Sequence, residues 1–140
     1  MSKDAKIRWG WLKGMYIFTL IHAGGTGLGI ILAQNTVRSI FNWPNQDPIV
    51  LGICGSIWFT AGIIAIFGLR APLKFSPLLF IQLIYKSVWF IGVILPIIIS
   101  GNFQAYAIGY VVFFAIYIIG DLIAIPFSYI FAPDCNTVAN

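Results

Sequence analysis

The stretch SPLLFIQLIYKSVWFIGVILPIIIS, residues 76–100, is apolar for long enough to cross a lipid bilayer. It nevertheless carries Lys86 near its middle. A charged side chain at the centre of a bilayer costs about 2.5–3.5 kcal/mol on insertion scales, so such a residue usually faces a protein interior and has a partner there. The stretch therefore predicts a transmembrane helix with one buried polar face.

The composition of the whole chain indicates the same class. Of the 140 residues, 60% are hydrophobic and 9% are charged, and the mean hydropathy is +0.95, whereas soluble domains have roughly 25% charged residues. The apolar stretches are continuous rather than alternating, which favours helices over a β-barrel. We predict an all-α, polytopic integral membrane protein with a single domain, residues 1–140, folded as an antiparallel four-helix transmembrane bundle.

Four apolar stretches define the predicted spans, at about residues 14–34, 49–69, 78–100 and 105–131. A basic head, residues 1–13, precedes them, and a short tail, residues 132–140, follows. An even number of spans places both termini on one side of the membrane.

The cations outside the spans indicate which side that is. One side has only Arg38. The side of the termini has the other six, which are Lys3, Lys6, Arg8, Lys13, Arg70 and Lys74. Short loops rich in Lys and Arg stay in the cytoplasm. We therefore predict cytoplasmic termini and a location in the bacterial inner membrane.

The first span is rich in small residues. Ala23 and Gly27 are four residues apart, and so are Gly25 and Gly29. Small residues at this spacing let helix backbones approach closely, so we predict that this helix is the most tightly packed. Trp58 and Phe59 lie mid-span and are interpreted as packing or lipid contacts, and Trp89 is interpreted as packing rather than as part of a cofactor cage.

Two prolines interrupt the last two spans. Pro96 cannot donate a hydrogen bond to the carbonyl of Gly92, which predicts a kink near the far end of the third span. Pro126 frees the carbonyl of Leu122 in the fourth span for the same reason.

The few ionisable groups inside the spans are predicted to share a common depth. With a rise of about 1.5 Å per residue, His22 lies roughly 12 Å from the cytoplasmic end of its span, and Lys86 and Asp121 lie roughly 15 Å from theirs. Asp121 is the only acidic residue inside another span. We therefore predict that its carboxylate pairs with the Lys86 ammonium.

Three further polar side chains belong to this predicted layer. Gln82 is one turn before Lys86 and stacks on the same helix face. Tyr117 is one turn before Asp121, so its hydroxyl is expected to bond the carboxylate. Tyr85 lies at the same level. The candidate ligand or proton-path residues are thus Lys86, Asp121, His22, Gln82, Tyr117 and Tyr85.

The predicted layer has two main interpretations. In the first, the chain is a non-enzymatic packing or accessory subunit, and the pair of Lys86 and Asp121 fixes the rotation of the helices. In the second, it is a small solute or proton carrier or binding protein, and the same two residues contact the solute or proton. A third reading is a membrane-embedded enzyme that acts on a lipid or a quinone.

The sequence offers little support for an enzyme. It contains no glutamate and no HExxH, CxxC, GxSxG or phosphate-binding loop. We therefore predict no catalytic residues, no metal site and no cofactor. The predicted partners are the lipid bilayer and either further copies of this chain or a larger membrane complex. No nucleic acid is expected, because the cations lie at the ends of the spans.

Two segments, IQLIYKSVWFIGVILP (residues 81–96) and DLIAIPFSYIF (residues 121–131), resemble the small four-helix bacterial membrane proteins of the DoxX-like kind. The likeness covers four spans, a glycine-rich first helix, and a lysine followed by an aromatic residue in the third. The resemblance implies a four-helix membrane fold and transfers no catalytic residues.

Overall fold

The computed structural model describes residues 7–132, and every regular element in that range is a helix. Four helical stretches are long and apolar enough to cross a membrane, namely Trp9–Phe41, Pro48–Arg70, Ser76–Ile99 and Ala107–Ala124. The predicted all-α class with four candidate spans is therefore confirmed. Residues 1–6 of the predicted head, with Lys3 and Lys6, and residues 133–140 of the predicted tail lie outside the described range.

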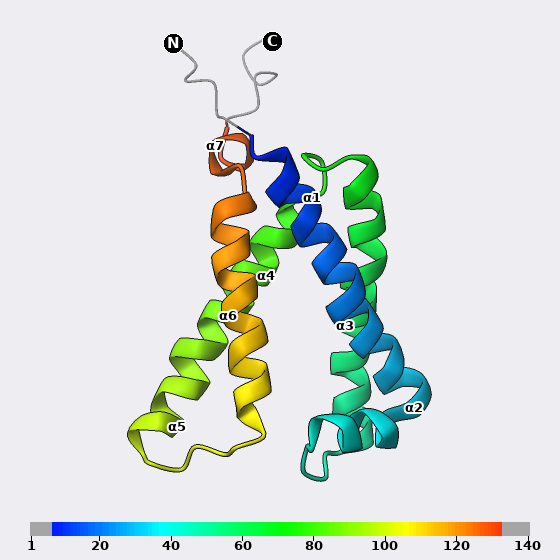
Figure 1. Cartoon of the computed structure of the whole chain (residues 1–140), viewed down its shortest axis with the longest axis vertical. Coiled ribbons are helices and arrows are strands. Elements are labelled where there is room, and N and C mark those ends of the chain that lie inside the picture. The colour runs from blue at the N-terminus through cyan, green and yellow to red at the C-terminus, as the bar shows by residue number, and fades with distance from the viewer. Residues whose placement is uncertain (1–6, 133–140) are drawn as a thin grey trace, which may run out of the picture.

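The first long helix combines three elements: α1 (Trp9–Phe18), the π-helical segment η1 (Thr19–Gly24) and α2 (Gly25–Phe41). It extends beyond the predicted span 14–34 at both ends, because helical hydrogen bonding continues past the apolar residues. The backbone leaves helical geometry at Ala33 (φ −147°, ψ 55°). After this bend the last turns of α2 lie across the lower end of the molecule (Figure 1).

The second long helix, α3 (Pro48–Arg70), has a well-defined start. Oδ1 of Asp47 accepts hydrogen bonds from the backbone N–H groups of Ile49 and Val50, each at 2.9 Å, and Pro48 occupies the first turn. Both features favour the start of a helix here, because the first N–H groups of a helix have no partner within it: Asp47 accepts hydrogen bonds from two of them, and Pro48 has no N–H to satisfy.

The third long helix contains α4 (Ser76–Trp89), the π-helical segment η2 (Phe90–Ile94) and α5 (Leu95–Ile99). The π-helical segment ends two residues before Pro96. A proline lacks the N–H that would bond the carbonyl four residues earlier. The irregularity that the sequence predicts near Pro96 therefore takes the form of a π-bulge.

The fourth long helix, α6 (Ala107–Ala124), is shorter than the predicted span 105–131. It ends before Pro126, and Ile125 is extended with ψ 124°. A separate short turn, α7 (Phe127–Ile130), follows. The predicted span was too long because Pro126 ends the helix rather than bending it: the residue before a proline is disfavoured in the helical region.

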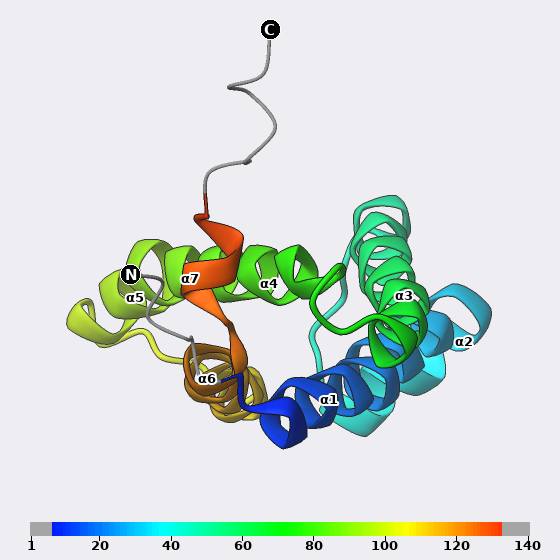
Figure 2. The same ribbon diagram turned by 90° about the horizontal axis from the view of Figure 1, so that it is seen from above.

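The four long helices associate as two pairs (Figures 1 and 2). In the first pair, α1, η1 and α2 pack on α3. In the second pair, α4 packs on α6. The pairs meet at the end of the molecule where α1 begins, here named the joined end, and separate toward the end that holds α5, here named the open end.

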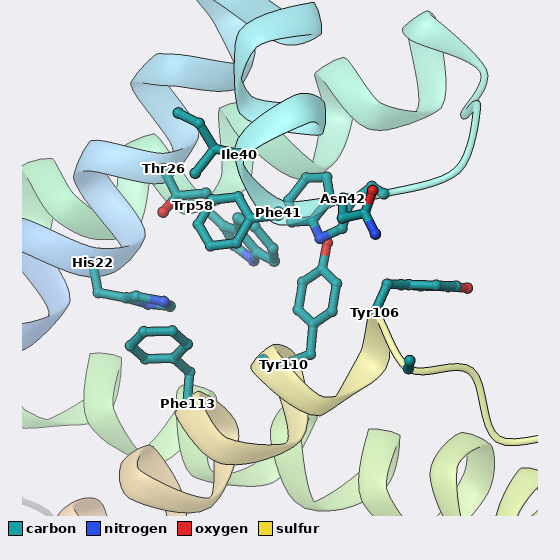
Figure 3. A pocket seen from close by; sticks show the side chains of 12 residues that line it. His22, Thr26, Ile40, Phe41, Asn42, Trp58, Tyr106, Tyr110 and Phe113 are labelled. Carbon is teal, nitrogen blue, oxygen red and sulfur yellow. The ribbon is translucent and has the colours of Figure 1, made fainter.

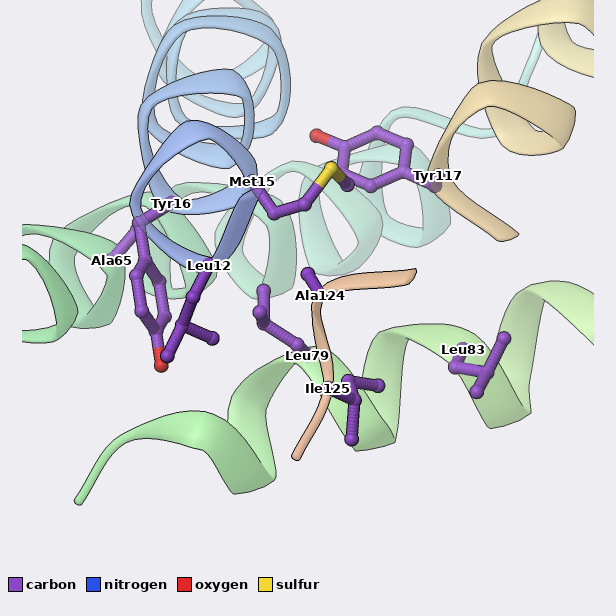
Figure 4. Packing of buried hydrophobic residues seen from close by; sticks show 9 residues of the cluster. All are labelled: Leu12, Met15, Tyr16, Ala65, Leu79, Leu83, Tyr117, Ala124 and Ile125. Carbon is purple, nitrogen blue, oxygen red and sulfur yellow. The ribbon is translucent and has the colours of Figure 1, made fainter. Parts of the chain in front are cut away.

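The joined end contains the larger apolar core (Figure 4). Its buried members come from all four long helices and the segment after α6: Leu12, Met15, Tyr16, Ala65, Leu79, Leu83, Tyr117, Ala124 and Ile125. The Tyr16 hydroxyl also donates a hydrogen bond of 2.7 Å to the carbonyl of Pro72 in the loop between α3 and α4. This core and hydrogen bond hold the two pairs together at one end.

Glycines bring the first pair into close contact. A Cβ added at Gly62 of α3 would overlap the backbone of Gly24, and one added at Gly27 would overlap the backbone of Phe59. By contrast, a Cβ added at Gly25 would meet nothing within 4 Å. The predicted close packing of this helix therefore involves Gly24 and Gly27 and not Gly25. Gly24 and Gly27 are three residues apart and share one helix face, whereas Gly25 lies off that face.

The close contact at Gly62 predicts that alanine substitutions at Gly62 and at Gly25 affect stability differently. We expect Gly62→Ala to lower the free energy of unfolding by about 1–3 kcal/mol, because its Cβ would meet backbone that cannot move aside. Gly25→Ala is the matched control and should leave stability unchanged or slightly higher. Thermal unfolding of both variants in mild detergent measures the difference. Equal midpoints for Gly62→Ala and Gly25→Ala would contradict the packing described here.

Candidate functional site

Lys86 is the centre of a buried polar cluster where α1, η1, α4 and α6 meet. It is 1% exposed, and its Nζ donates a hydrogen bond of 3.4 Å to Oε1 of Gln82. The same oxygen accepts a hydrogen bond of 3.2 Å from Oγ1 of Thr19. Gln82 therefore links the amine to the first long helix.

Aromatic rings surround the rest of the ammonium group. Nζ of Lys86 lies 3.8 Å from the ring centroid of Tyr117, 4.3 Å from that of Tyr85 and 5.3 Å from that of Phe114. A ring face attracts a cation through its quadrupole, and this attraction strengthens when water is excluded. The lysine is thus stabilised chiefly by rings and one amide oxygen.

The predicted pairing of Lys86 with Asp121 is not present as a direct contact. Asp121 is 0% exposed, yet neither carboxylate oxygen has a hydrogen-bond partner among residues 7–132. The expected hydrogen bond from Tyr117 is also missing, since its hydroxyl has no partner in the described part of the chain. The ring of Tyr117 is instead turned over the lysine amine.

His22 lies in an aromatic stack beside this cluster. Its ring centroid is 4.1 Å from that of Phe113, 5.6 Å from that of Phe18 and 5.7 Å from that of Tyr117. Its Nδ1 atom is buried and has no partner within residues 7–132. The predicted site residues therefore divide: Gln82, Tyr85 and Tyr117 contact Lys86, whereas Asp121 and His22 lie nearby without bonding to it.

Thr19 is a member of the cluster that the sequence analysis did not single out. It is 0% exposed and joins the first long helix to Gln82. Its position three residues before His22, on the same helix face, was a signal that could have identified it.

A cavity of about 660 Å³ lies between the two helix pairs in the half toward the open end. Seven of its fifteen lining residues are aromatic: Trp43, Trp58, Tyr85, Trp89, Tyr106, Tyr110 and Phe114. Trp58 is ten residues from the start of α3, which is about 15 Å along the helix. The cavity therefore reaches from the open end to roughly the middle of the molecule.

The deep end of this cavity borders the polar cluster. Tyr85 and Phe114 line the cavity, and the Lys86 amine lies over the same two rings. A second cavity of about 340 Å³ shares four lining residues with the first and is also bordered by His22 and Phe113 (Figure 3). Each cavity thus touches one part of the predicted polar layer.

Apart from Tyr85, the aromatic lining was not predicted as a site. Trp58 and Trp89 come from different helices, and only the separation of the two pairs places both on one cavity. Within residues 7–132, no group of three or more His, Cys, Asp or Glu side chains is arranged to hold a metal ion.

Comparison of the chain with protein-family models, curated proteins and solved structures finds no match. The resemblance to DoxX-like proteins therefore stays a prediction. The candidate site rests on its own geometry.

The missing ion pair leads to a prediction about stability. We expect the double variant Lys86→Met with Asp121→Asn to unfold at or above the temperature of the parent protein. The reason is that both charged groups lose their hydration on burial and have no direct ion pair to offset that cost, so neutral side chains of similar size remove a penalty. Thermal unfolding in detergent measures the effect.

Asp47→Asn with Lys74→Met makes the same chemical changes at exposed positions and serves as the control. The control should unfold like the parent, because asparagine caps a helix as well as aspartate does. A loss of stability in the Lys86 and Asp121 variant alone would indicate that these two groups hold the fold together.

Proposed function

We propose that this chain is a four-span integral membrane protein that binds a small molecule in the cavity between its helix pairs, as a binding protein or carrier. The observation that carries the proposal is the cavity of about 660 Å³ whose deep end borders the Lys86 cluster. Ligand sites typically measure about 300–1,000 Å³, are mostly apolar, and contain a few convergent polar groups. The cavity between the pairs fits that description.

The buried polar groups also favour binding over a purely structural layer. A structural layer would have its members satisfy one another. Instead, several buried polar atoms of the layer have no hydrogen-bond partner within residues 7–132. They are both carboxylate oxygens of Asp121, the hydroxyl of Tyr117, Nδ1 of His22 and the amide nitrogen of Gln82. Unpaired buried polar atoms are uncommon in native proteins, and ionisable groups inside transmembrane segments are typical of functional sites.

The distribution of cations supports the orientation proposed for the membrane. The start of α1 and the end of α3 lie at the joined end (Figure 1), and Arg8, Lys13, Arg70 and Lys74 are in or next to these segments, whereas Arg38 is in the last turn of α2 toward the open end. With the joined end in the cytoplasm of a bacterial cell, both termini are cytoplasmic. The cavity then lies in the half of the bundle toward the opposite side of the inner membrane.

This orientation predicts which loops can be labelled from outside the cell. In a variant with Cys54 and Cys135 replaced by serine, Asn102→Cys in the loop between α5 and α6 should react with a membrane-impermeant maleimide in intact cells. Lys74→Cys, in the loop between α3 and α4, should react only after the cells are opened. The reverse pattern would contradict the orientation, and labelling of both in intact cells would contradict the four-span arrangement.

The binding proposal predicts the effect of filling the cavity. Ala107 lines it, so Ala107→Phe should remove a bound molecule while the protein still folds. Native mass spectrometry of the full chain released from detergent should detect an added mass on the parent and its loss in Ala107→Phe.

Ile108→Phe is the matched control, because Ile108 is the next residue of α6, is 54% exposed and does not line the cavity. It should retain the added mass. A bound molecule that persists in Ala107→Phe would contradict binding at this place.

A further inference from the structure

The walls of the larger cavity restrict the shape of its ligand. Tyr110 lies at the centre of the lining: Trp43 stacks on it with ring centroids 4.9 Å apart at 15°, and Trp58 and Trp89 are tilted at 55° and 56° with centroids 6.4 Å away. Aromatic pairs gain from both stacked and edge-to-face contacts. Rings presented at these angles offer both kinds of contact to a flat ring that lies against them in the cavity.

The charges around the cavity restrict the charge of the ligand. No lining residue is charged, so an ion inside would lose its hydration without gaining a counter-charge. A cation at the deep end of the cavity would be repelled by the Lys86 ammonium, which already lies over the rings of Tyr85 and Phe114. An anion would meet the negative faces of those rings before it reached the amine. A neutral ligand avoids all three costs.

The polar atoms of the lining restrict the functional group. The hydroxyls of Tyr85, Tyr106 and Tyr110 and the indole N–H groups of the tryptophans can all donate hydrogen bonds. An indole can only donate, which favours an acceptor on the ligand. A carbonyl oxygen attached to a flat ring supplies such a hydrogen-bond acceptor without adding charge.

We propose that the cavity binds a neutral, flat ring that carries a hydrogen-bond-accepting oxygen, of the chemical class of an aryl ketone. This inference rests on the proposed binding function and names its ligand class. The ring lies against Tyr110 and the tryptophans, and the oxygen accepts from a tyrosine hydroxyl or an indole of the lining.

Four naphthalenes of similar size separate these contributions. 2-Acetylnaphthalene is neutral and has an acceptor, 2-isopropylnaphthalene lacks the acceptor, 2-naphthoate is an anion, and 2-naphthyltrimethylammonium is a cation. Equilibrium dialysis against nanodiscs of phosphatidylcholine, with the full chain or without protein, gives protein-dependent binding. We expect the ketone to bind at least 10-fold more tightly than either ion and at least 3-fold more tightly than the isopropyl compound.

The cavity variants locate the binding. Ala107→Phe should weaken binding of the ketone at least 10-fold, and Ile108→Phe should leave it unchanged. Cys54→Phe, which fills the same cavity from α3, provides a second test where Ala107→Phe does not fold. Ketone binding that is insensitive to both filling variants would overturn the assignment to this cavity.

The outcomes also separate this inference from the proposed function. Tighter binding of the cation or the anion, or equal binding of the isopropyl compound, would overturn the ligand class and leave the binding function standing. The same holds if none of the probes binds saturably while native mass spectrometry still detects a molecule that Ala107→Phe removes. Absence of both probe binding and a bound molecule would overturn the function and the ligand class together.

Discussion

The mutual orientation of the long helices depends on how the Lys86 ammonium is buried. A lysine inside an apolar helix needs a stabilising environment, and here rings and an amide oxygen provide it: Tyr117 and Tyr85 face the amine, and Gln82 accepts its hydrogen bond. Tyr117 belongs to α6, so the arrangement fixes α6 against α4. Thr19 bonds to the same Gln82 oxygen and extends this constraint to the first long helix. Three of the four long helices are thereby held at one level.

Close glycine contacts and this polar cluster act on different parts of the molecule. The backbones of Gly24 and Gly62 meet within the first pair, whereas the Lys86 cluster and the apolar core join the first pair to the second. Beyond these contacts, toward the open end, large rings such as Trp58 and Tyr110 lie between the pairs instead of small residues. The bulk of these rings keeps the pairs apart, and the cavity is the space that their packing leaves.

Much of the fold followed from hydropathy, because a continuous apolar stretch of about 20 residues allows little but a helix. The level of the polar residues also followed from helical rise, which places Lys86, Asp121 and His22 near one another along the helices. The contacts among them did not follow, since a ring can replace a carboxylate as the partner of an amine. The spacing of the small residues was a further source of error, because Gly24 packs on α3 three residues before Gly27, whereas only pairs four residues apart were considered.

The aromatic cavity is where sequence reasoning was weakest, for a physical reason. Trp and Tyr near the end of a span are normally interpreted as anchors at the membrane interface, and nothing in a single helix distinguishes an anchor from the wall of a cavity. Trp43 is mostly buried and stacks on Tyr110 from another helix pair, so it contacts protein where an anchor would contact lipid headgroups. Trp58 and Trp89 are about 15 Å from the ends of their helices at the open end, too deep for an interfacial belt. Their depth, combined with the separation of the pairs, is what makes these residues a candidate binding site.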